Sequence, residues 1–360
     1  MTIIHQSISI CASLYFVLKI NIKILLYKFL TKNKVIFFYH PKKNLTKNHI
    51  NYIDKHFSSY KDILTIYGSL FFFNKKNYYL IKPFFLNFIY GVDFFVTNNV
   101  SDQFTRNSNK IYVHHDIFDT PLVESKKEVI LCNRLLKYDF IVVASELSKK
   151  IFFELFRNTK SHPKIISFRY LKLDYFQKKM KLSKVKKCKT VLIAPTNFRS
   201  FPQLSIQKIL PSIIKILLKY NFKVIYRPHP SNREEVIVNK IKYFFSKYNN
   251  FYFDQSIDYA ETFKSSDILI TDLSGTAYTF LVLCSKPVVF YSKHSSVKNF
   301  IYKNLNYFRF RSKIGYIVNN NKELIKVLNL KSIYKQKNKS IKKLSNLFLS
   351  QKKMNIRYFY

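Results

Sequence analysis

From about residue 34 onward, short runs of apolar residues alternate with longer mixed stretches. This spacing is typical of a parallel sheet, in which buried strands are separated by the helices that cover them. In the first half the predicted strands are 35–39, 92–96, 111–113 and 140–143, and a helix with Phe152, Phe153, Leu155 and Phe156 follows. In the second half the predicted strands are 191–193, 224–226, 251–253, 268–271 and 288–291.

Helical patterns fill the gaps between the strands of the second half. The predicted helices are 209–220, 234–248, 257–264 and one through Tyr278, Phe280, Leu281 and Leu283. Pro211 suits the start of the first helix, and Asn221 suits its C-terminal turn. Regular alternation of strand and helix predicts a doubly wound α/β sheet with right-handed crossovers.

The periodic pattern stops in a lysine-rich stretch between Tyr175 and Lys189. With 360 residues and 48% hydrophobic content, the chain is long enough for two domains on either side of this break. We expect an N-terminal domain over 32–180 and a C-terminal domain over 189–330. Residues 331–360 are basic, with apolar positions at helical spacing, and predict a basic C-terminal helix or tail; these positions are Ile341, Leu344, Leu347 and Phe348.

The first 31 residues form a possible membrane-associated segment. Residues 2–18 carry no formal charge, but the run is shorter than the ~20 apolar residues of a spanning helix. It is interrupted by Ser7, Ser9, Ser13, Lys19, Lys23 and Lys28. No positively charged region precedes it, which argues against a secretory signal. Interfacial attachment to a membrane and an ordinary N-terminal structural segment both remain open.

Charge adds a preference for anionic partners. The 62 Lys and Arg against 20 Asp and Glu give a formal net charge of +42, which favours contact with a polyanion or an anionic membrane. An AT-rich genome is the alternative source of this lysine-rich composition. No recognition helix, aromatic RNA-binding strand or metal finger is found, so we expect no nucleic-acid partner. The four cysteines are far apart and predict buried, reduced thiols in a cytoplasmic protein.

Polar clusters follow several predicted strands of the second half directly. Arg227 and His229 stand in an Arg-Pro-His-Pro loop after strand 224–226. The prolines stiffen the loop, an arginine can grip phosphate oxygens with two hydrogen bonds, and a histidine can donate another. Ligands of open parallel sheets bind at this edge, so the loop predicts a phosphate site. Two solvated loop residues are the alternative.

A second cluster crosses from strand 268–271 into the following helix. Here Asp272, Ser274, Gly275 and Thr276 combine hydroxyl donors, a glycine that permits close approach, and the unpaired amides of a helix start. A short Ser-Gly-Thr turn is weak by itself, because serine and threonine also cap ordinary helices. Its place at a strand end, downstream of the Arg-Pro-His-Pro loop, makes it a second candidate phosphate contact.

These motifs resemble the CDP-glycerol glycerophosphotransferase family, which includes teichoic-acid and capsule enzymes. The resemblance lies in LIAPTNFR (192–199), VIYRPHPSN (224–232) and SSDILITDLSGTAYTFLVLCSKPVVFY (265–291), and it is good over about 189–295. It implies a GT-B fold, in which two Rossmann-like doubly wound domains face a cleft. It also implies that Thr196 and Arg199 border the same pocket as Arg227, His229, Asp272 and residues 274–276.

The first half matches the family more loosely. IYVHHDIFDTPL (111–122) is similar to the family's histidine motif, and YDFI (138–141) to the strand after it. Many members have His-Gly-Thr-Pro here, whereas this chain has Asp116 after His115, which puts in doubt which histidine corresponds and which acceptor is used. The resemblance implies His115 as the catalytic base, with His114 as the substitute. Both could instead be core or capping histidines.

The resemblance implies transfer of glycerol phosphate, or a similar polyol phosphate, from a CDP-linked alcohol to an acceptor hydroxyl, with release of CMP. No metal or other cofactor is implied, since the CDP-alcohol is itself a substrate. The implied partners are this donor, an anionic or lipid-linked polymer acceptor and the cytoplasmic face of the membrane. A GT-B glycosyltransferase that uses a nucleotide sugar is the alternative enzyme. A basic, catalytically idle protein that holds anionic polymer is the alternative from another class.

Overall fold

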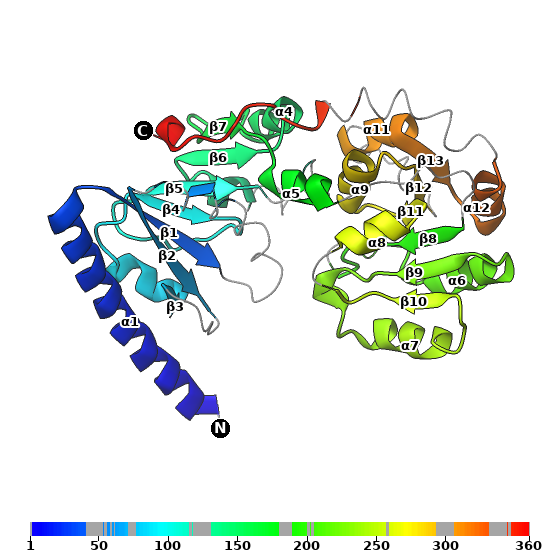
Figure 1. Ribbon diagram of the computed structural model, residues 1–360, viewed down its shortest axis with the longest axis horizontal. Helices are drawn as coiled ribbons and strands as arrows, with labels where there is room; N and C mark the ends of the chain where they lie inside the picture. Colours follow the sequence, from blue (N-terminus) through cyan, green and yellow to red (C-terminus); the bar gives the residue numbers. More distant parts are fainter. Residues whose placement is uncertain are drawn as a thin grey trace.

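The chain folds into two α/β halves that lie side by side, with helix α5 (Leu171–Lys179) between them (Figure 1). This computed structural model describes residues 2–40, 53, 56–57, 60, 62–70, 77–114, 117, 131–179, 189–199, 202, 205–256, 259–292, 306–330, 344 and 347–359. Each half is built around one parallel sheet with helices on both faces.

The N-terminal half contains a seven-stranded parallel sheet in the order β3-β2-β1-β4-β5-β6-β7. The strands are β1 (Lys34–His40), β2 (Ile63–Ser69), β3 (Tyr78–Leu80), β4 (Phe94–Thr97), β5 (Asn109–Val113), β6 (Phe140–Val143) and β7 (Lys164–Ser167). One face is covered by α1 (Thr2–Thr31), η1 (Pro83–Phe88) and α4 (Glu146–Leu155). The other face packs against the end of the chain, through Met354 and Phe359.

The C-terminal half contains a six-stranded parallel sheet in the order β10-β9-β8-β11-β12-β13. The strands are β8 (Thr190–Ile193), β9 (Lys223–Tyr226), β10 (Phe251–Phe253), β11 (Ile268–Thr271), β12 (Val288–Tyr291) and β13 (Gly315–Val318). Helices α6 (Leu210–Lys219), α7 (Val236–Phe245) and α12 (Asn321–Leu328) cover one face. Helices α8 (Ala260–Ser265), α9 (Thr276–Cys284) and α11 (Asn306–Ile314) cover the other, together with part of α5.

The two sheets share one winding pattern, and the predicted fold class of two Rossmann-like doubly wound units is confirmed. In both, the first strand along the chain lies in the middle, the next two extend one edge, and the chain then returns to build the other edge. The order of building therefore reverses between β1 and β4, and again between β8 and β11. Such switch points open a crevice at the carboxyl ends of the strands, where ligands of doubly wound sheets bind.

Local signals explain how the central elements form. All four residues of β11 are buried, because helices cover both faces of the sheet. Pro211 stands in the first turn of α6, and Asn221 follows this helix at φ 59°, in the left-handed region that closes helix ends. Both residues were predicted for these places. The strands β2, β3, β7 and β13 were not predicted.

The chain end crosses back from one half to the other. Leu344 and Phe348 pack in the core of the C-terminal half, and Met354 and Phe359 in that of the N-terminal half. Leu344 and Leu347 are helical, as expected for the basic tail. Residues 349–355, however, have no regular structure, and η4 (Ile356–Phe359) is a 3-10 turn. The crossing depends on a few apolar side chains in each half. The segments that carry them are too short to show a periodic pattern in the sequence.

Two cysteines match the expectation of buried thiols, and one does not. Cys132 and Cys284 are buried, and burial raises the pKa of Cys284 to about 12. Cys11 is exposed, because it lies on the outer side of α1. Cys188 is outside the described residues.

Candidate functional site

Asp272 lies at the switch point of the C-terminal sheet, directly after β11. Its Oδ1 accepts hydrogen bonds from the amides of Thr196 (2.8 Å) and Leu273 (2.6 Å). Its Oδ2 accepts one from the amide of Ile206 (2.9 Å). Burial raises the pKa of this carboxyl group, and the three backbone donors oppose that shift. Asp272 thus joins the loop after β8 to the loop after β11.

The start of α9 lies next to this joint. The Ser274 hydroxyl accepts from the amide of Thr276 (3.3 Å), and the Ser274 carbonyl from the amide of Ala277 (3.1 Å). Gly275 has φ −56°, which any residue can adopt, so no positive φ requires glycine at this position. Ser274 is buried, whereas Thr276 is half-buried. The proposed contacts between a phosphate and the start of α9 remain predictions.

The Arg-Pro-His-Pro loop is joined to the same region by its backbone. The amide of Arg227 donates to the carbonyl of Ile193 at the end of β8 (2.9 Å). In the same loop, Asn232 Oδ1 accepts from the amide of Phe198 (3.3 Å). The loops after β8, β9 and β11 are therefore linked to one another at one edge of the sheet, as the positions of their motifs predicted.

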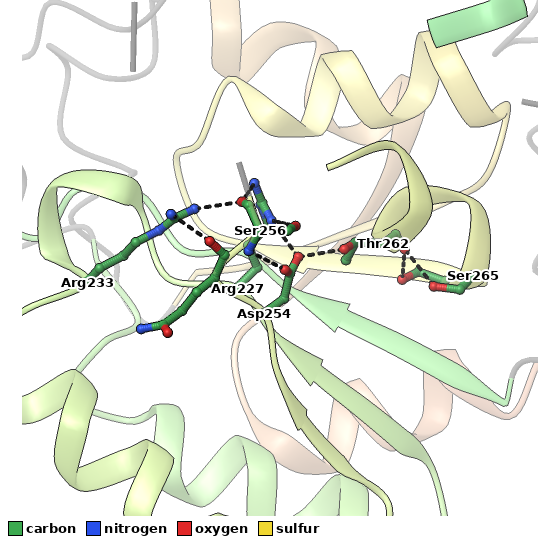
Figure 2. A network of polar contacts seen from close by, with 8 residues as sticks. Arg227, Arg233, Asp254, Ser256, Thr262 and Ser265 are labelled. Carbon is green, nitrogen blue, oxygen red and sulfur yellow. Dashed lines mark hydrogen bonds and ion pairs between the residues drawn. The ribbon is translucent and has the colours of Figure 1, made fainter. Parts of the chain in front are cut away.

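The Arg227 guanidinium lies within a network of protein groups (Figure 2). Nη1 contacts Asp254 Oδ2 at 2.5 Å and the Ser256 hydroxyl at 3.0 Å, and Nη2 donates to the Ser256 carbonyl at 2.9 Å. The side chains of this ion pair are only 9% and 12% exposed. Arg227 therefore fixes the loop after β10 in this structure, and its predicted grip on a phosphate would have to use the rest of its surface or a rearrangement.

A second arginine converges on the same loop. Arg233 donates from Nη1 to the Gln255 carbonyl (2.8 Å) and from Nη2 to the Ser256 carbonyl (3.0 Å) (Figure 2). Burial, and then the charge of Arg227, lower the pKa of Arg233. Burial acts to raise the pKa of Asp254, but hydrogen bonds from Ser256 and Thr262 and the charge of Arg227 bring it below its usual value. Arg227 pairs with the Asp254 carboxylate and Arg233 binds neighbouring carbonyl groups, so two guanidinium charges lie near one carboxylate and leave positive potential here.

His229 and Arg199 have different surroundings. His229 Nδ1 accepts from the amide of Ser231 (3.2 Å), so the neutral ring carries its proton on Nε2. Nε2 is then the donor nitrogen of this ring. Arg199 forms an ion pair with Glu235, and its side chain is 67% exposed. The contact with Glu235 turns Arg199 toward the start of α7, and its role in the pocket remains a prediction.

The candidate histidines of the N-terminal half follow β5. His114 is buried, its amide donates to the Val142 carbonyl (2.8 Å), and its ring packs edge-on against Phe152 with centroids 5.1 Å apart. His115 lies outside the described residues. Ile117 is buried in the same cluster as Leu273 and Ala277 of the C-terminal half. The described residues on either side of His115 thus connect the end of β5 to the region of the α9 start.

Three residues of this region were not singled out from the sequence: Lys172, Asp254 and Tyr259. Asp254 follows β10 directly, and its place after a predicted strand was an available signal. Tyr259 and Lys172 come from different halves and meet with the Lys172 ammonium 4.5 Å from the ring centroid. No local pattern indicates such a contact.

Comparison with known proteins gives a consistent result. The family model of CDP-glycerol:poly(glycerophosphate) glycerophosphotransferase matches residues 105–355. Over 155 residues, 41% of the chain, the sequence is 29% identical to the minor teichoic acid biosynthesis protein GgaB of Bacillus subtilis (strain 168), and the match covers 16% of GgaB.

Solved structures show the same fold. The wall teichoic acid polymerase TagF superimposes with a TM-score of 0.60 at 18% identity, covering 96% of this chain and 93% of that one. MnaA of S. aureus, solved with UDP, superimposes with a TM-score of 0.58 at 10% identity, covering 90% and 99%.

Proposed function

Because the chain belongs to the CDP-glycerol:poly(glycerophosphate) glycerophosphotransferase family, we propose that it transfers glycerol phosphate, or a similar polyol phosphate, from a CDP-linked donor to an acceptor hydroxyl. The motifs that suggested this family lie within the matched residues 105–355. One structure of TagF is described with CDPG soaked in, which supports a CDP-linked donor here. We propose teichoic-acid or capsule-like polymer as the acceptor.

The reaction joins two substrates across the two halves. The acceptor oxygen attacks the β-phosphorus of the donor, a new P–O bond forms, and the bond from this phosphorus to the bridging oxygen breaks. CMP leaves with the electron pair, and a base takes the acceptor's proton. His115 is the proposed base, and His114 is the substitute. Arg227, His229 and residues 274–276 hold the diphosphate, and Thr196 and Arg199 border it.

The observation that carries this proposal is the linkage of three loops at the switch point. Asp272 accepts from Thr196, the Arg227 amide donates to Ile193, and Asn232 accepts from Phe198. A diphosphate bound at this edge meets an α9 start, an imidazole donor and an excess of guanidinium charge in one place. A helix start and fixed cations stabilise phosphate without having to reorganise.

Replacing His115 and His229 by alanine, one at a time, separates their proposed roles. His115→Ala should lower transfer by on the order of 10² to 10⁴ and retain most donor affinity, because a base acts in the chemical step. His229→Ala should lower both the rate of transfer and the affinity for the donor, because His229 is proposed to contact the diphosphate. Turnover of the donor and calorimetric binding of CDP are the two measurements. Normal turnover by His115→Ala would show that the base is another group.

The released nucleotide identifies the reaction. We expect CMP when the protein is incubated with CDP-glycerol or CDP-ribitol and an acceptor, because the pyrophosphate bond is broken. A glycosyltransferase given nucleotide sugars would release a nucleoside diphosphate instead. If the chain only holds anionic polymer, it should bind such polymer in a salt-sensitive way and not bind CDP.

The outer side of α1 supports attachment to a membrane surface. Residues Ile10–Thr31 are apolar and long enough to cross a membrane; an 18-residue window within them has a mean hydropathy of 1.7, yet only 22% of that window is buried. Its exposed large apolar side chains are Ile10, Leu14, Tyr15, Leu18, Ile22, Leu25, Leu26, Phe29 and Leu30. The opposite side, with Val17, Ile20 and Ile24, packs on the N-terminal sheet. A helix held by one face and apolar on the other fits the bilayer surface rather than a span.

Flotation with vesicles tests this attachment. Leu18→Glu with Leu25→Glu should abolish binding to vesicles that contain anionic lipid, since both residues lie on the exposed side of α1. Val236→Glu, at an exposed apolar residue of α7, is the control that should bind as the natural protein does. Retained binding of the double variant would show that α1 is not the contact. We propose the cytoplasmic face of the membrane as the location.

A further inference from the structure

Lys172 is a buried cation at the junction of the two halves. It lies in the first turn of α5, after the carboxyl end of β7, and is 8% exposed. Its neighbours in α5, Leu173 and Phe176, pack in the buried cluster that includes Leu273 and Ala277 at the α9 start. Lys172 is therefore contributed by the N-terminal half but positioned against the C-terminal half.

The ammonium group of Lys172 lies over the ring of Tyr259, which also lies near Arg227 of the proposed donor-binding site. Lys172 Nζ is 4.5 Å from the ring centroid of Tyr259 and 5.8 Å from that of Phe176. The guanidinium carbon of Arg227 is 5.9 Å from the same Tyr259 ring. One tyrosine thus connects a cation of the N-terminal half with the arginine of the Arg-Pro-His-Pro loop.

Lys172 also lies beside one of the candidate histidines, His114. It lines one small cavity together with His114, Val113, Arg169, Tyr170 and Met354. The cavity, of about 20 Å³, has room for about one water molecule. It lies at the carboxyl ends of β5, β6 and β7, the edge from which His115 continues the chain. The lysine thus stands between Tyr259 of the proposed donor site on one side and His114 on the other.

From this placement we infer that Lys172 is a substrate-binding residue whose ammonium contacts the transferred phosphoryl group, the β-phosphate of the CDP-linked donor. The inference rests on the proposed function, because it assumes a donor diphosphate at the switch point. Negative charge spreads over the oxygens of this phosphoryl group during transfer, and a fixed, buried cation stabilises it there. The Tyr259 ring holds the ammonium through its π face, and so orients it before substrate arrives.

The choice between CDP and CMP as ligands tests this contact. CDP carries the β-phosphate and CMP does not. Lys172→Met should therefore lower the affinity for CDP by roughly 10- to 100-fold and leave the affinity for CMP within about twofold of that of the natural protein. Calorimetric titration of the full chain measures both. Lys172→Arg should keep most of the preference for CDP, because it retains the charge. Lys240→Met, at an exposed lysine of α7, is the matched control for loss of one positive charge.

The ratio of the two affinities does not depend on the fraction of folded protein, so a partly unfolded variant remains informative. If Lys172→Met does not fold, Lys172→Gln is the second variant, with a polar but uncharged side chain. An unchanged ratio, or equal weakening of CDP and CMP, overturns the contact with the β-phosphate. Unchanged CDP affinity with a raised KM for the acceptor overturns it too. If the natural protein binds neither nucleotide, the proposed function itself fails, and the inference fails with it.

Discussion

The two sheets have the same winding but different chemistry at their carboxyl edges. In the C-terminal half, the loops after β9, β10 and β11 begin with Arg227, Asp254 and Asp272, three charged residues that are mostly shielded from solvent. In the N-terminal half, the buried polar groups described at the ends of β1 and β5 are His40 and His114. His40 stacks on Tyr67 and Tyr78, with ring centroids 6.3 Å and 6.1 Å apart.

This difference separates two tasks that phosphoryl transfer requires. A donor diphosphate needs fixed charges and amides, and buried charges persist only when they are paired and hydrogen-bonded. An acceptor hydroxyl needs a group that can take a proton near neutral pH, which imidazole does. At the C-terminal edge the shielded charges are accordingly held by an ion pair and by backbone amides, whereas the buried polar groups at the ends of β1 and β5 are imidazoles packed against aromatic rings. Lys172 is the cation that reaches from the second edge to the first.

The amino edges of the two sheets, by contrast, are alike. Asp93 accepts from the amide of Val35 (2.8 Å), and Asp139 from that of Lys110 (2.7 Å). In the C-terminal sheet, Asp267 accepts from the amides of Lys189 (2.9 Å) and Thr190 (2.8 Å). Each aspartate precedes a strand and holds the start of its neighbour. The first aspartate of the SSDILITD motif is thus structural, although it stands only five positions before Asp272.

The largest expected effect compares the two aspartates on either side of β11. Asp272→Ala removes the acceptor of three amides and should lower the free energy of unfolding by about 3 kcal/mol, because buried donors without acceptors are costly. It should also lower the affinity for CDP by more than about tenfold, since the loops after β8 and β11 lose the hydrogen bonds that connect them. Asp267→Ala should lower stability and leave CDP affinity unchanged. Equal loss of CDP affinity in both would erase the distinction between the two edges.

A second comparison sets a shielded ion pair against an exposed one. Arg227 and Asp254 have 9% and 12% exposed side chains, whereas Arg134 and Asp102 of the N-terminal half have 38% and 45%. A double-mutant cycle with alanine should give a coupling of about 3 kcal/mol for the first pair, because loss of one partner leaves an uncompensated charge. For the second pair we expect at most about 1 kcal/mol. Thermal and urea unfolding without ligand are the measurements, and similar couplings would contradict the contrast.

A smaller effect follows from the protonation of Asp254. Its pKa in the folded protein is below the value of about 4 that an aspartate has in unfolded chains. The ionised form therefore stabilises the fold above that pH, and this stability is lost as pH falls through the folded pKa. At pH 7 the free energy of unfolding of the natural protein should exceed that of Asp254→Asn by at least about 1 kcal/mol. The difference should shrink below about pH 4, and a constant difference down to pH 3 would contradict the assignment.

The sequence patterns were most informative where strands are buried on both sides. Strands β6 and β11 were predicted at their observed bounds, because covering helices leave continuous apolar runs. Of the edge strands, β3, β7 and β13 were missed, although β10, which is equally short and partly exposed, was predicted, and the interior strand β2 was missed as well. The same geometry made the site predictable, because residues after parallel strands meet at one edge.

The pairings inside the site could not be predicted in the same way. The contact of Arg227 with Asp254 depends on how the loop after β10 turns back toward β9. The contact of Lys172 with Tyr259 depends on how the two halves pack. Neither has a local sequence signature, so the arginine was assigned to phosphate alone and the lysine was overlooked.

The smallest effect concerns two of the three described asparagines in the left-handed region, Asn221 of the C-terminal half and Asn77 of the N-terminal half. Asn221 has φ 59°, and Asn77 has φ 65°. Asn77 also donates from Nδ2 to the Thr65 carbonyl (3.2 Å) and accepts from Lys23 (2.5 Å), so it ties β2 to α1. Asn221→Gly should change the free energy of unfolding by only a few tenths of a kcal/mol, because glycine adopts this conformation freely.

Asn77→Gly should instead cost about 1 kcal/mol, because it removes two side-chain hydrogen bonds while the backbone stays permitted. Asn221→Ala is the matched control for conformation and should cost about 1 kcal/mol, since alanine is strained at positive φ. Urea unfolding of the three variants measures these differences. If both glycine variants were equally neutral, the attachment of α1 through Asn77 would contribute nothing to the N-terminal half, and the apolar contacts of Val17, Ile20 and Ile24 and the other polar contacts of α1 would hold the helix.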